Sequence, residues 1–253
     1  MPKTTQSVQS VQRAIQILEY VSDRPRSQTE VAEYIDVHRS TALRLLETLT
    51  EGGLTRRNEH GLYSVGYRLA GLAHQALDQF NLSNLAHEHL SRLSILSGHT
   101  VHLAELTAHK IVYADKIDPA RSVRLYSEIG QSVPFHTSGV AKAILAFQPS
   151  AFVDEVLQGY EFTSHTATTM RDTAELVGQL AEVQARGWAV DDAEFEDFIN
   201  CIAAPVRDST GRVIAAVSIT ALKAKANLEQ LEDLLPNLLT TTESISQELG
   251  WRP

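Results

Sequence analysis

The chain has 253 residues, of which 43% are hydrophobic and 21% charged, and its formal net charge is −9. This composition excludes a disordered chain, and the short, interrupted apolar runs exclude a membrane-spanning helix. No apolar signal region follows the N-terminal residues, and the single cysteine, Cys201, excludes an internal disulfide, so we expect a cytoplasmic protein with no membrane partner.

The first predicted element is an amphipathic helix that ends before Pro25. Its apolar residues recur at helical spacing and are Val11, Ala14, Ile15, Leu18 and Val21. A second helix is predicted to begin at Ser27, because Ser27 and Glu30 have the spacing of a capping box, in which a hydroxyl and a carboxylate satisfy free backbone amides. The buried side of this second helix is predicted to carry Val31, Ala32 and Ile35.

A third helix is predicted after a turn at residues 36–38, ending at Gly52 and Gly53, because glycine adopts the left-handed C-cap conformation at little cost. Its apolar stripe consists of Ala42, Leu45, Leu46 and Leu49. Its other face carries side chains that can bond to phosphates and base edges, namely Arg39, Ser40, Thr41, Arg44 and Thr48. Recognition helices read bases with their N-terminal half, so we predict that this face contacts double-stranded DNA.

A hairpin is predicted next, with extended residues at 54–57 and 62–65 around a turn at 58–61. We expect its tip to bring Arg56, Arg57 and His60 near the sugar-phosphate backbone. Three helices followed by such a hairpin indicate a winged helix-turn-helix. The alternative is two ordinary amphipathic helices and a hairpin whose charges are merely solvated.

Charge is distributed unevenly along the chain. Residues 1–70 contain 9 Lys and Arg against 8 Asp and Glu, a net of +1, whereas residues 71–253 carry a net of −10. We therefore expect modest DNA affinity per subunit, a steep salt dependence and a requirement for two subunits. The acidic second part argues against a nucleoid protein that binds DNA without sequence choice.

Residues 67–81 continue a helical pattern and are predicted to form a linker helix. Beyond this linker, helices alternate with runs that resemble antiparallel strands, which predicts an α+β domain. The predicted helices cover residues 83–98, 172–187 and 228–249, the last bent at Pro236. The extended runs cover residues 101–106, 111–113, 123–126, 201–206 and 213–220.

Several motifs resemble those of the IclR family of bacterial transcription regulators, and the similarity covers nearly the whole chain. They are RSTALRLL at 39–46, GLYSVG at 61–66, HTSGVAKAILA at 136–146, GWAVDD at 187–192, CIAAPVRD at 201–208 and GRVIAAVSIT at 211–220. The resemblance implies a winged helix-turn-helix domain (1–66), a linker helix (67–81) and a GAF-like effector-binding domain (82–253). It also implies a homo-oligomer, either a dimer or a dimer of dimers, that controls a catabolic operon, and we expect a repressor.

Residues 111–113, 116–118 and 124–130 resemble the ketodeoxygluconate-type regulators of sugar-acid breakdown within this family. Other positions depart from the family pattern. The family often has Gly and Pro where this chain has Asp36 and His38, and Gly where it has Phe198. We expect the first two differences to affect operator choice and the third to affect the mouth of the pocket.

The resemblance also implies a set of effector-binding residues: Leu125, Gly139, Val140, Asp191, Ile199, Cys201, Ser218 and Thr220. Free amides at a helix that starts near Gly139 could bind a carboxylate, and Asp191 could accept hydrogen bonds from effector hydroxyls. We therefore predict a small organic acid, in particular a sugar-acid or keto-acid metabolite. The alternative is that Ser138 only caps a helix and Asp191 only caps a turn.

An enzyme is the competing functional interpretation. Cys201, with His136 as base and Asp191 as orienting acid, would make a thiol-dependent hydrolase with a DNA-targeting module. A lone cysteine at the start of an apolar strand is more often a small buried hydrophobe, so we expect no catalytic residues. The histidines lack metal-ligand spacing, and we expect neither a metal nor a cofactor.

Overall fold

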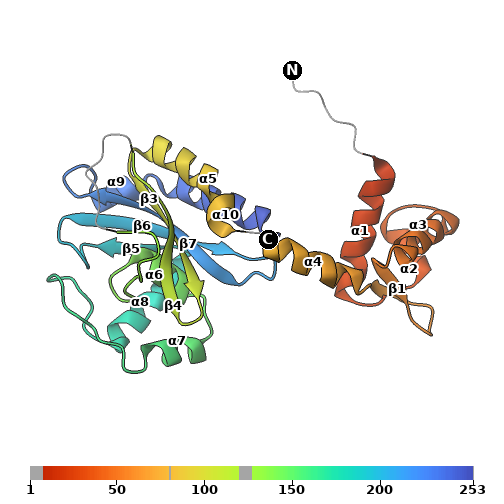
Figure 1. Cartoon of the computed structure of the whole chain (residues 1–253), viewed down its shortest axis with the longest axis horizontal. Coiled ribbons are helices and arrows are strands. Elements are labelled where there is room, and N and C mark those ends of the chain that lie inside the picture. The colour runs from red at the N-terminus through yellow and green to blue at the C-terminus, as the bar shows by residue number, and fades with distance from the viewer. Residues whose placement is uncertain (1–7, 80, 120–126, 253) are drawn as a thin grey trace, which may run out of the picture. The chain divides into compact units, whose positions relative to one another are not determined.

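The chain folds into two units, residues 1–80 and 81–253 (Figure 1). The first unit has one hydrophobic core and the second has two. The structure is a computed structural model that describes residues 8–79, 81–119 and 127–252. The predicted fold class is confirmed, because a winged helix-turn-helix precedes an α+β domain with an antiparallel sheet. Within the described ranges, no helix combines the length and the apolar character that crossing a bilayer requires.

Among its described residues, the first unit consists of helices and one short hairpin. The elements are α1 (Gln9–Asp23), α2 (Gln28–Tyr34), α3 (Arg39–Glu51), β1 (Thr55–Arg57), β2 (Tyr63–Val65) and α4 (Arg68–Gln79). Its core combines residues of α1, α2, α3 and β2, including Ile17, Val31, Leu46 and Tyr63. The predicted stripe of α1 was partly wrong: Ile17 is buried in this core, whereas Ile15 is 51% exposed.

Local hydrogen bonds determine where α2 and α3 begin. The predicted capping box is confirmed, since the Glu30 amide donates to the Ser27 hydroxyl (3.3 Å) and the Ser27 amide donates to the Glu30 carboxylate (2.8 Å). His38 caps α3, because the Ser40 amide donates to its Nδ1 at 3.3 Å. In the turn between the two helices, Asp36 adopts a left-handed conformation with φ of 50°, which aspartate tolerates better than most residues.

The hairpin is joined closely to the helices. Tyr63 pairs with Arg57 across the hairpin and forms a further antiparallel bridge with Arg26, which follows α1. Gly66, just after β2, approaches the chain at Gly53 so closely that a Cβ at position 66 would lie 2.1 Å from the Gly53 carbonyl oxygen. Only glycine fits at Gly66, and the hairpin is thereby held against the end of α3.

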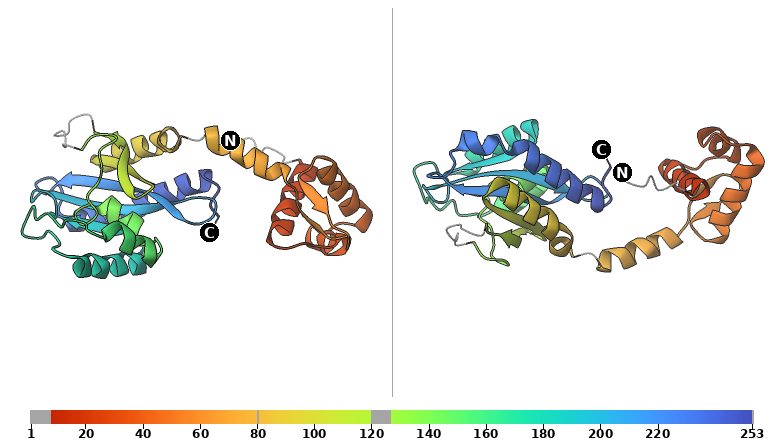
Figure 2. Two further views of the ribbon diagram at one scale, coloured as in Figure 1. Left: turned by 60° about the horizontal axis from the view of Figure 1, so that its bottom comes forward. Right: turned by 90° about the horizontal axis from the view of Figure 1, so that it is seen from above.

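Among its described residues, the second unit is an antiparallel sheet with helices on both faces (Figure 2). Its elements are α5 (Leu82–Ser97), β3 (Thr100–Thr107), β4 (Lys110–Ile117), α6 (Gly139–Leu145), α7 (Ser150–Leu157), α8 (Thr173–Arg186), β5 (Ala189–Asp192), β6 (Ile199–Arg207), β7 (Val213–Leu222), α9 (Leu228–Glu232) and α10 (Leu235–Glu248). The strand order is β4-β3-β7-β6-β5, and all neighbouring strands are antiparallel.

Alternation of side chains along the strands gives this unit two cores. Ile202 and Ala204 of β6 pack in a core with apolar residues of α5 and α10. Ala203, between them, packs on the other face in a core formed with α6, α7 and α8. Cys201, two residues before Ala203, therefore lies on the α6 face of the sheet.

The C-terminal helix differs from its prediction. The prediction of a single helix bent at Pro236 was wrong, because the chain forms α9 and then α10. Pro236 lies in the first turn of α10. Proline is tolerated there since the first amides of a helix have no intrahelical partner. The short elements β5 and α7 were not predicted. The predicted extended run at residues 123–126 lies outside the residues that the structure describes.

Candidate functional site

The predicted DNA-contacting face of α3 is exposed, and the opposite face packs in the core of the first unit. The exposed residues of this face are Arg39, Ser40, Thr41, Arg44 and Thr48. The residues buried on the other side are Ala42, Leu46 and Leu49. Helical periodicity thus leaves a continuous polar surface that a ligand outside the protein can reach.

The beginning of α3 is held by two contacts that were not predicted. The His38 Nδ1 lies 2.8 Å from the Ser40 hydroxyl, and the side-chain amide of Gln28 in α2 donates to the Arg39 carbonyl at 3.0 Å. These bonds position the backbone of the first turn. The guanidinium groups of Arg39 and Arg44 form no ion pair with any residue that the structure describes.

The hairpin positions its basic residues differently from the expectation. Arg56 and Arg57 lie within β1, and only His60 lies in the turn at the tip. The Arg56 guanidinium lies 5.1 Å from the centroid of the Tyr67 ring, and Arg57 Nε donates to the Gly61 carbonyl at 3.4 Å. All three basic side chains remain exposed.

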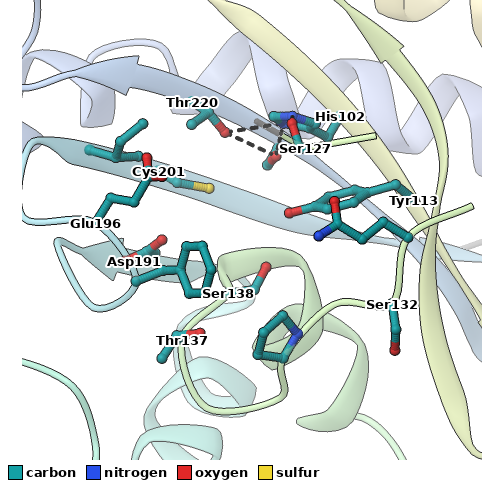
Figure 3. Close-up of a pocket in the computed structure, with 15 residues that line it drawn as sticks. His102, Tyr113, Ser127, Ser132, Thr137, Ser138, Asp191, Glu196, Cys201 and Thr220 are labelled. Atoms are coloured by element: carbon teal, nitrogen blue, oxygen red, sulfur yellow. Dashed lines mark hydrogen bonds between the residues drawn. The ribbon is translucent and has the colours of Figure 1, made fainter. Parts of the chain in front are cut away.

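The second unit contains a cavity of about 210 Å³ on the α6 face of the sheet (Figure 3). All five strands contribute to its wall, together with the loops before α6 and after β5. The lining residues are His102, Tyr113, Ser127, Gln131, Ser132, Pro134, Thr137, Ser138, Asp191, Phe195, Glu196, Ile199, Cys201, Ser218 and Thr220. Convergent hydroxyl, carboxyl, amide and imidazole groups beside aromatic rings suit a small polar molecule.

Five of the eight predicted effector-binding residues line this cavity, namely Asp191, Ile199, Cys201, Ser218 and Thr220. Gly139 and Val140 do not line it. A Cβ on Gly139 would lie 3.0 Å from Cys201 Sγ, so this glycine allows α6 to approach β6. Val140 is buried in the hydrophobic core on the α6 face of the sheet. Leu125 lies outside the described residues.

Strand register explains how residues distant in sequence meet at the cavity. Asp191 pairs with Cys201 across β5 and β6, and Cys201 pairs with Thr220 across β6 and β7. Ser218 in turn pairs with His102 across β7 and β3. Directly paired residues point to the same face of a sheet, so these side chains lie close together above it.

His102 was missed by the sequence analysis and lies in a polar network at one end of the cavity. Its Nε2 lies 2.8 Å from the Ser127 hydroxyl, and its Nδ1 lies 3.3 Å from the Thr220 hydroxyl and 3.5 Å from the Ser218 hydroxyl. Burial, helped by the charge of Lys116, lowers the pKa of His102 to about 3, so the ring is neutral near pH 7.

Asp191 lies buried in the cavity wall beside a second carboxylate. The Glu194 amide donates to Asp191 Oδ1 at 2.8 Å, and Lys142 Nζ donates to both carboxylate oxygens of Glu194 at 2.7 and 2.6 Å. Burial, followed by the charge of Glu194, raises the pKa of Asp191 to about 7, although the Glu194 amide bond and the charge of Lys142 act in the opposite direction. Asp191 thus caps a turn and also brings to the cavity a carboxyl group that exchanges its proton near neutral pH.

The start of α6 brings further hydroxyl groups to the opposite end of the cavity. Ser138 occupies the N-cap position, but its side chain forms no capping hydrogen bond. The Tyr113 hydroxyl interacts with Ser138, and burial raises the pKa of Tyr113, so the phenol keeps its proton. Thr137 lies beside Ser138 in Figure 3 and is 1% exposed.

The geometry does not support a catalytic cysteine. Burial, followed by the charge of Asp191, raises the pKa of the Cys201 thiol to about 12, so no thiolate forms near pH 7. The proposed base, His136, is engaged elsewhere: its Nδ1 lies 2.8 Å from the Tyr160 hydroxyl and its Nε2 lies 3.0 Å from the Thr163 carbonyl. In the parts of the chain that the structure describes, no cluster of His, Cys, Asp and Glu residues could hold a metal ion.

Comparison with known proteins relates both units to one family. The IclR helix-turn-helix domain matches residues 10–59, and the C-terminal domain of the bacterial transcriptional regulator IclR matches residues 74–247. The Escherichia coli transcriptional regulator KdgR is 32% identical over 253 residues, which cover 99% of this chain and 96% of KdgR. XynR, also from Escherichia coli, is 30% identical over 247 residues, which cover 96% of this chain and 98% of XynR.

Solved structures agree with this relationship. The crystal structure of the Agobacterium tumefaciens repressor BlcR superimposes with a TM-score of 0.81 and 25% sequence identity, covering 98% of this chain and 100% of BlcR. The matched regions include both the α3 face and the cavity. The chain therefore belongs to the IclR family of bacterial transcriptional regulators.

Proposed function

We propose that this transcription regulator is controlled by a small organic acid, with α3 reading an operator and the cavity binding the effector. One observation carries the proposal: an exposed polar helix face in one unit is combined with a polar cavity in the other. The buried, protonated thiol of Cys201 supports a role without catalysis.

The DNA contacts divide into two groups. We assign base-edge contacts to the first half of α3, that is, to Arg39, Ser40, Thr41 and Arg44. We assign backbone contacts to Thr48, Arg56, Arg57 and His60. Arginine bonds to guanine through two donors, which makes Arg39 and Arg44 the strongest candidates for sequence discrimination. Their freedom from protein ion pairs within the described residues supports this assignment.

A single subunit offers few phosphate contacts, and its acidic second unit is repelled by DNA. We therefore propose a homo-oligomer, either a dimer or a dimer of dimers. Two copies of α3 would then occupy half-sites separated by about 34 Å or a multiple of that distance.

The effector is proposed to be a sugar-acid or keto-acid metabolite of a catabolic operon that the protein represses. The hydroxyl-rich cavity wall supports a ligand with several oxygen atoms. Asp191 supports an acid, because a protonated carboxyl group can donate to a carboxylate. The full-length similarity to KdgR agrees with the ketodeoxygluconate-type motifs in the sequence.

Effector binding must be coupled to DNA binding through the chain between the two units, which includes α4. An effector changes operator affinity only if it binds the DNA-competent and DNA-incompetent arrangements with different affinities. We propose that occupancy of the cavity favours an arrangement in which the two α3 helices no longer match their half-sites.

Operator binding tests the proposal. Fluorescence anisotropy with the DNA upstream of the protein's own gene should show a specific complex whose affinity falls steeply between about 50 and 200 mM salt. Unrelated DNA of equal length is the control. Addition of the effector acid should weaken the specific complex. Equal affinity for both DNA fragments would contradict the operator assignment, whereas specific binding that no organic acid alters would contradict the effector assignment alone.

A further inference from the structure

Among the residues that the structure describes, Thr137 carries the buried side-chain polar atom that lacks a hydrogen-bond partner. The residue is 1% exposed and lines the cavity. Buried hydroxyl groups in native proteins are nearly always paired, because desolvation without a partner costs free energy. An unpaired hydroxyl in the wall of a ligand cavity therefore indicates a bond that the ligand supplies.

Three threonines in the loop before α8 all have acceptors for their hydroxyl groups. Thr169 donates to the Glu194 carbonyl at 2.7 Å, and Thr166 and Thr168 donate to the Ala193 carbonyl at 2.6 and 2.7 Å. The Thr137 hydroxyl has no such acceptor. The missing bond is therefore specific to the position of Thr137.

The two ends of the cavity differ in whether their polar side chains already have hydrogen-bond partners. At one end, the imidazole of His102 and the hydroxyls of Ser127 and Thr220 already bond to one another. At the other end, Thr137 has no partner and Ser138 makes no capping bond (Figure 3). A polar head group can bond to Thr137 at the second end without displacing any internal hydrogen bond of that hydroxyl.

We propose that Thr137 is a specificity-determining residue that donates a hydrogen bond to an oxygen atom in the head group of the effector. The inference rests on the proposed function and adds a requirement to it. Effectors with a carbonyl, carboxylate or hydroxyl oxygen at the α6 end are favoured, and analogues with hydrogen or methyl there are rejected. Such analogues bind more weakly because they do not supply the bond that the Thr137 hydroxyl lacks.

Thr137→Val tests the assignment, since valine matches threonine in shape but lacks the hydroxyl. The variant should melt about 2 to 4 °C higher than wild type without ligand, because it buries no unpaired polar group. Thr242→Val is the matched control. Thr242 is also buried, donates to the Leu239 carbonyl at 3.1 Å and lies on α10, outside the cavity lining. Loss of that bond should lower the melting temperature.

Affinity is then measured by calorimetry with pyruvate, D-gluconate and 2-keto-3-deoxygluconate. For an acid that binds wild type, Thr137→Val should weaken binding about tenfold, and Thr242→Val should leave it unchanged. A lower melting temperature for Thr137→Val, or equal affinity in wild type and Thr137→Val, would overturn the assignment. Absence of binding by every acid to wild type would instead contradict the effector class of the proposed function, and the assignment would fall with it.

Discussion

Asp191 carries a carboxyl group whose pKa the fold raises from 3.8 to about 7, chiefly through burial. In the unfolded chain the same group ionises near its ordinary value. Between about pH 4 and 7, the folded protein therefore keeps a proton that the unfolded chain has released. The stability that this group contributes is complete below about pH 4 and is lost as the pH rises through 7.

The variant Asp191→Asn tests this dependence, because asparagine can still accept the Glu194 amide but does not titrate. We expect its stability advantage over wild type to be about 3 kcal/mol larger at pH 8 than at pH 5, since the wild type loses about 1.4 kcal/mol per pH unit up to the folded pKa of Asp191. Urea unfolding at the two pH values measures the difference. Asp154→Asn, on the exposed side of α7, controls for the loss of a negative charge. A stability advantage of Asp191→Asn that is the same at pH 5 and pH 8 would show that folding does not raise the pKa of Asp191.

Individual site residues were predictable only in part. The family motifs pointed to Asp191, Cys201 and Thr220, and all three line the cavity. His102 and Thr137 were missed, because their roles depend on cross-strand register and on the absence of an acceptor, and neither is encoded locally. Reading the apolar residues on either side of His102 as the buried face of a strand would have directed His102 to the α6 side.

Helix α2 depends on its capping box, because seven residues are too few for a stable isolated helix. Ser27→Ala removes the hydroxyl that accepts the Glu30 amide, and should destabilise the first unit by about 1 kcal/mol. Urea unfolding followed by circular dichroism measures the effect. Ser22→Ala, at an exposed position within α1, should change stability by less than about 0.5 kcal/mol. Equal effects of the two substitutions would show that the cap contributes nothing specific.

Weakening α2 should also affect α3. Gln28 of α2 donates to the Arg39 carbonyl, so α2 holds the first turn of the helix that we assign to base contacts. Elements with local signals of this kind were predicted well: the capping box of α2 and the extended runs 201–206 and 213–220, now β6 and β7, are where the sequence indicates. The elements β5 and α7 were not, since four and eight residues give too little periodicity to distinguish a strand or helix from a loop.

The distribution of charge supports a division of labour between the two units. Residues 1–70 are close to neutral and include exposed arginines on α3 and β1, whereas the remainder is strongly acidic and contains the cavity. DNA is therefore attracted only to the first unit, while the second unit discourages binding in other orientations. Substitutions in one unit should accordingly leave the other unit's ligand affinity intact, although the coupling between the two sites changes.

Two substitutions measured in both assays test this separation. Arg44→Ala should weaken operator binding at least about tenfold, because it removes a proposed two-donor contact to a base, and should not change effector affinity. Asp191→Ala should weaken effector binding about tenfold and leave effector-free operator binding unchanged. Arg92→Ala, which removes an equal charge from α5, controls for long-range electrostatics. If Arg44→Ala lowered effector affinity as much as operator affinity, the reading of DNA and the sensing of metabolites would not be properties of separate units.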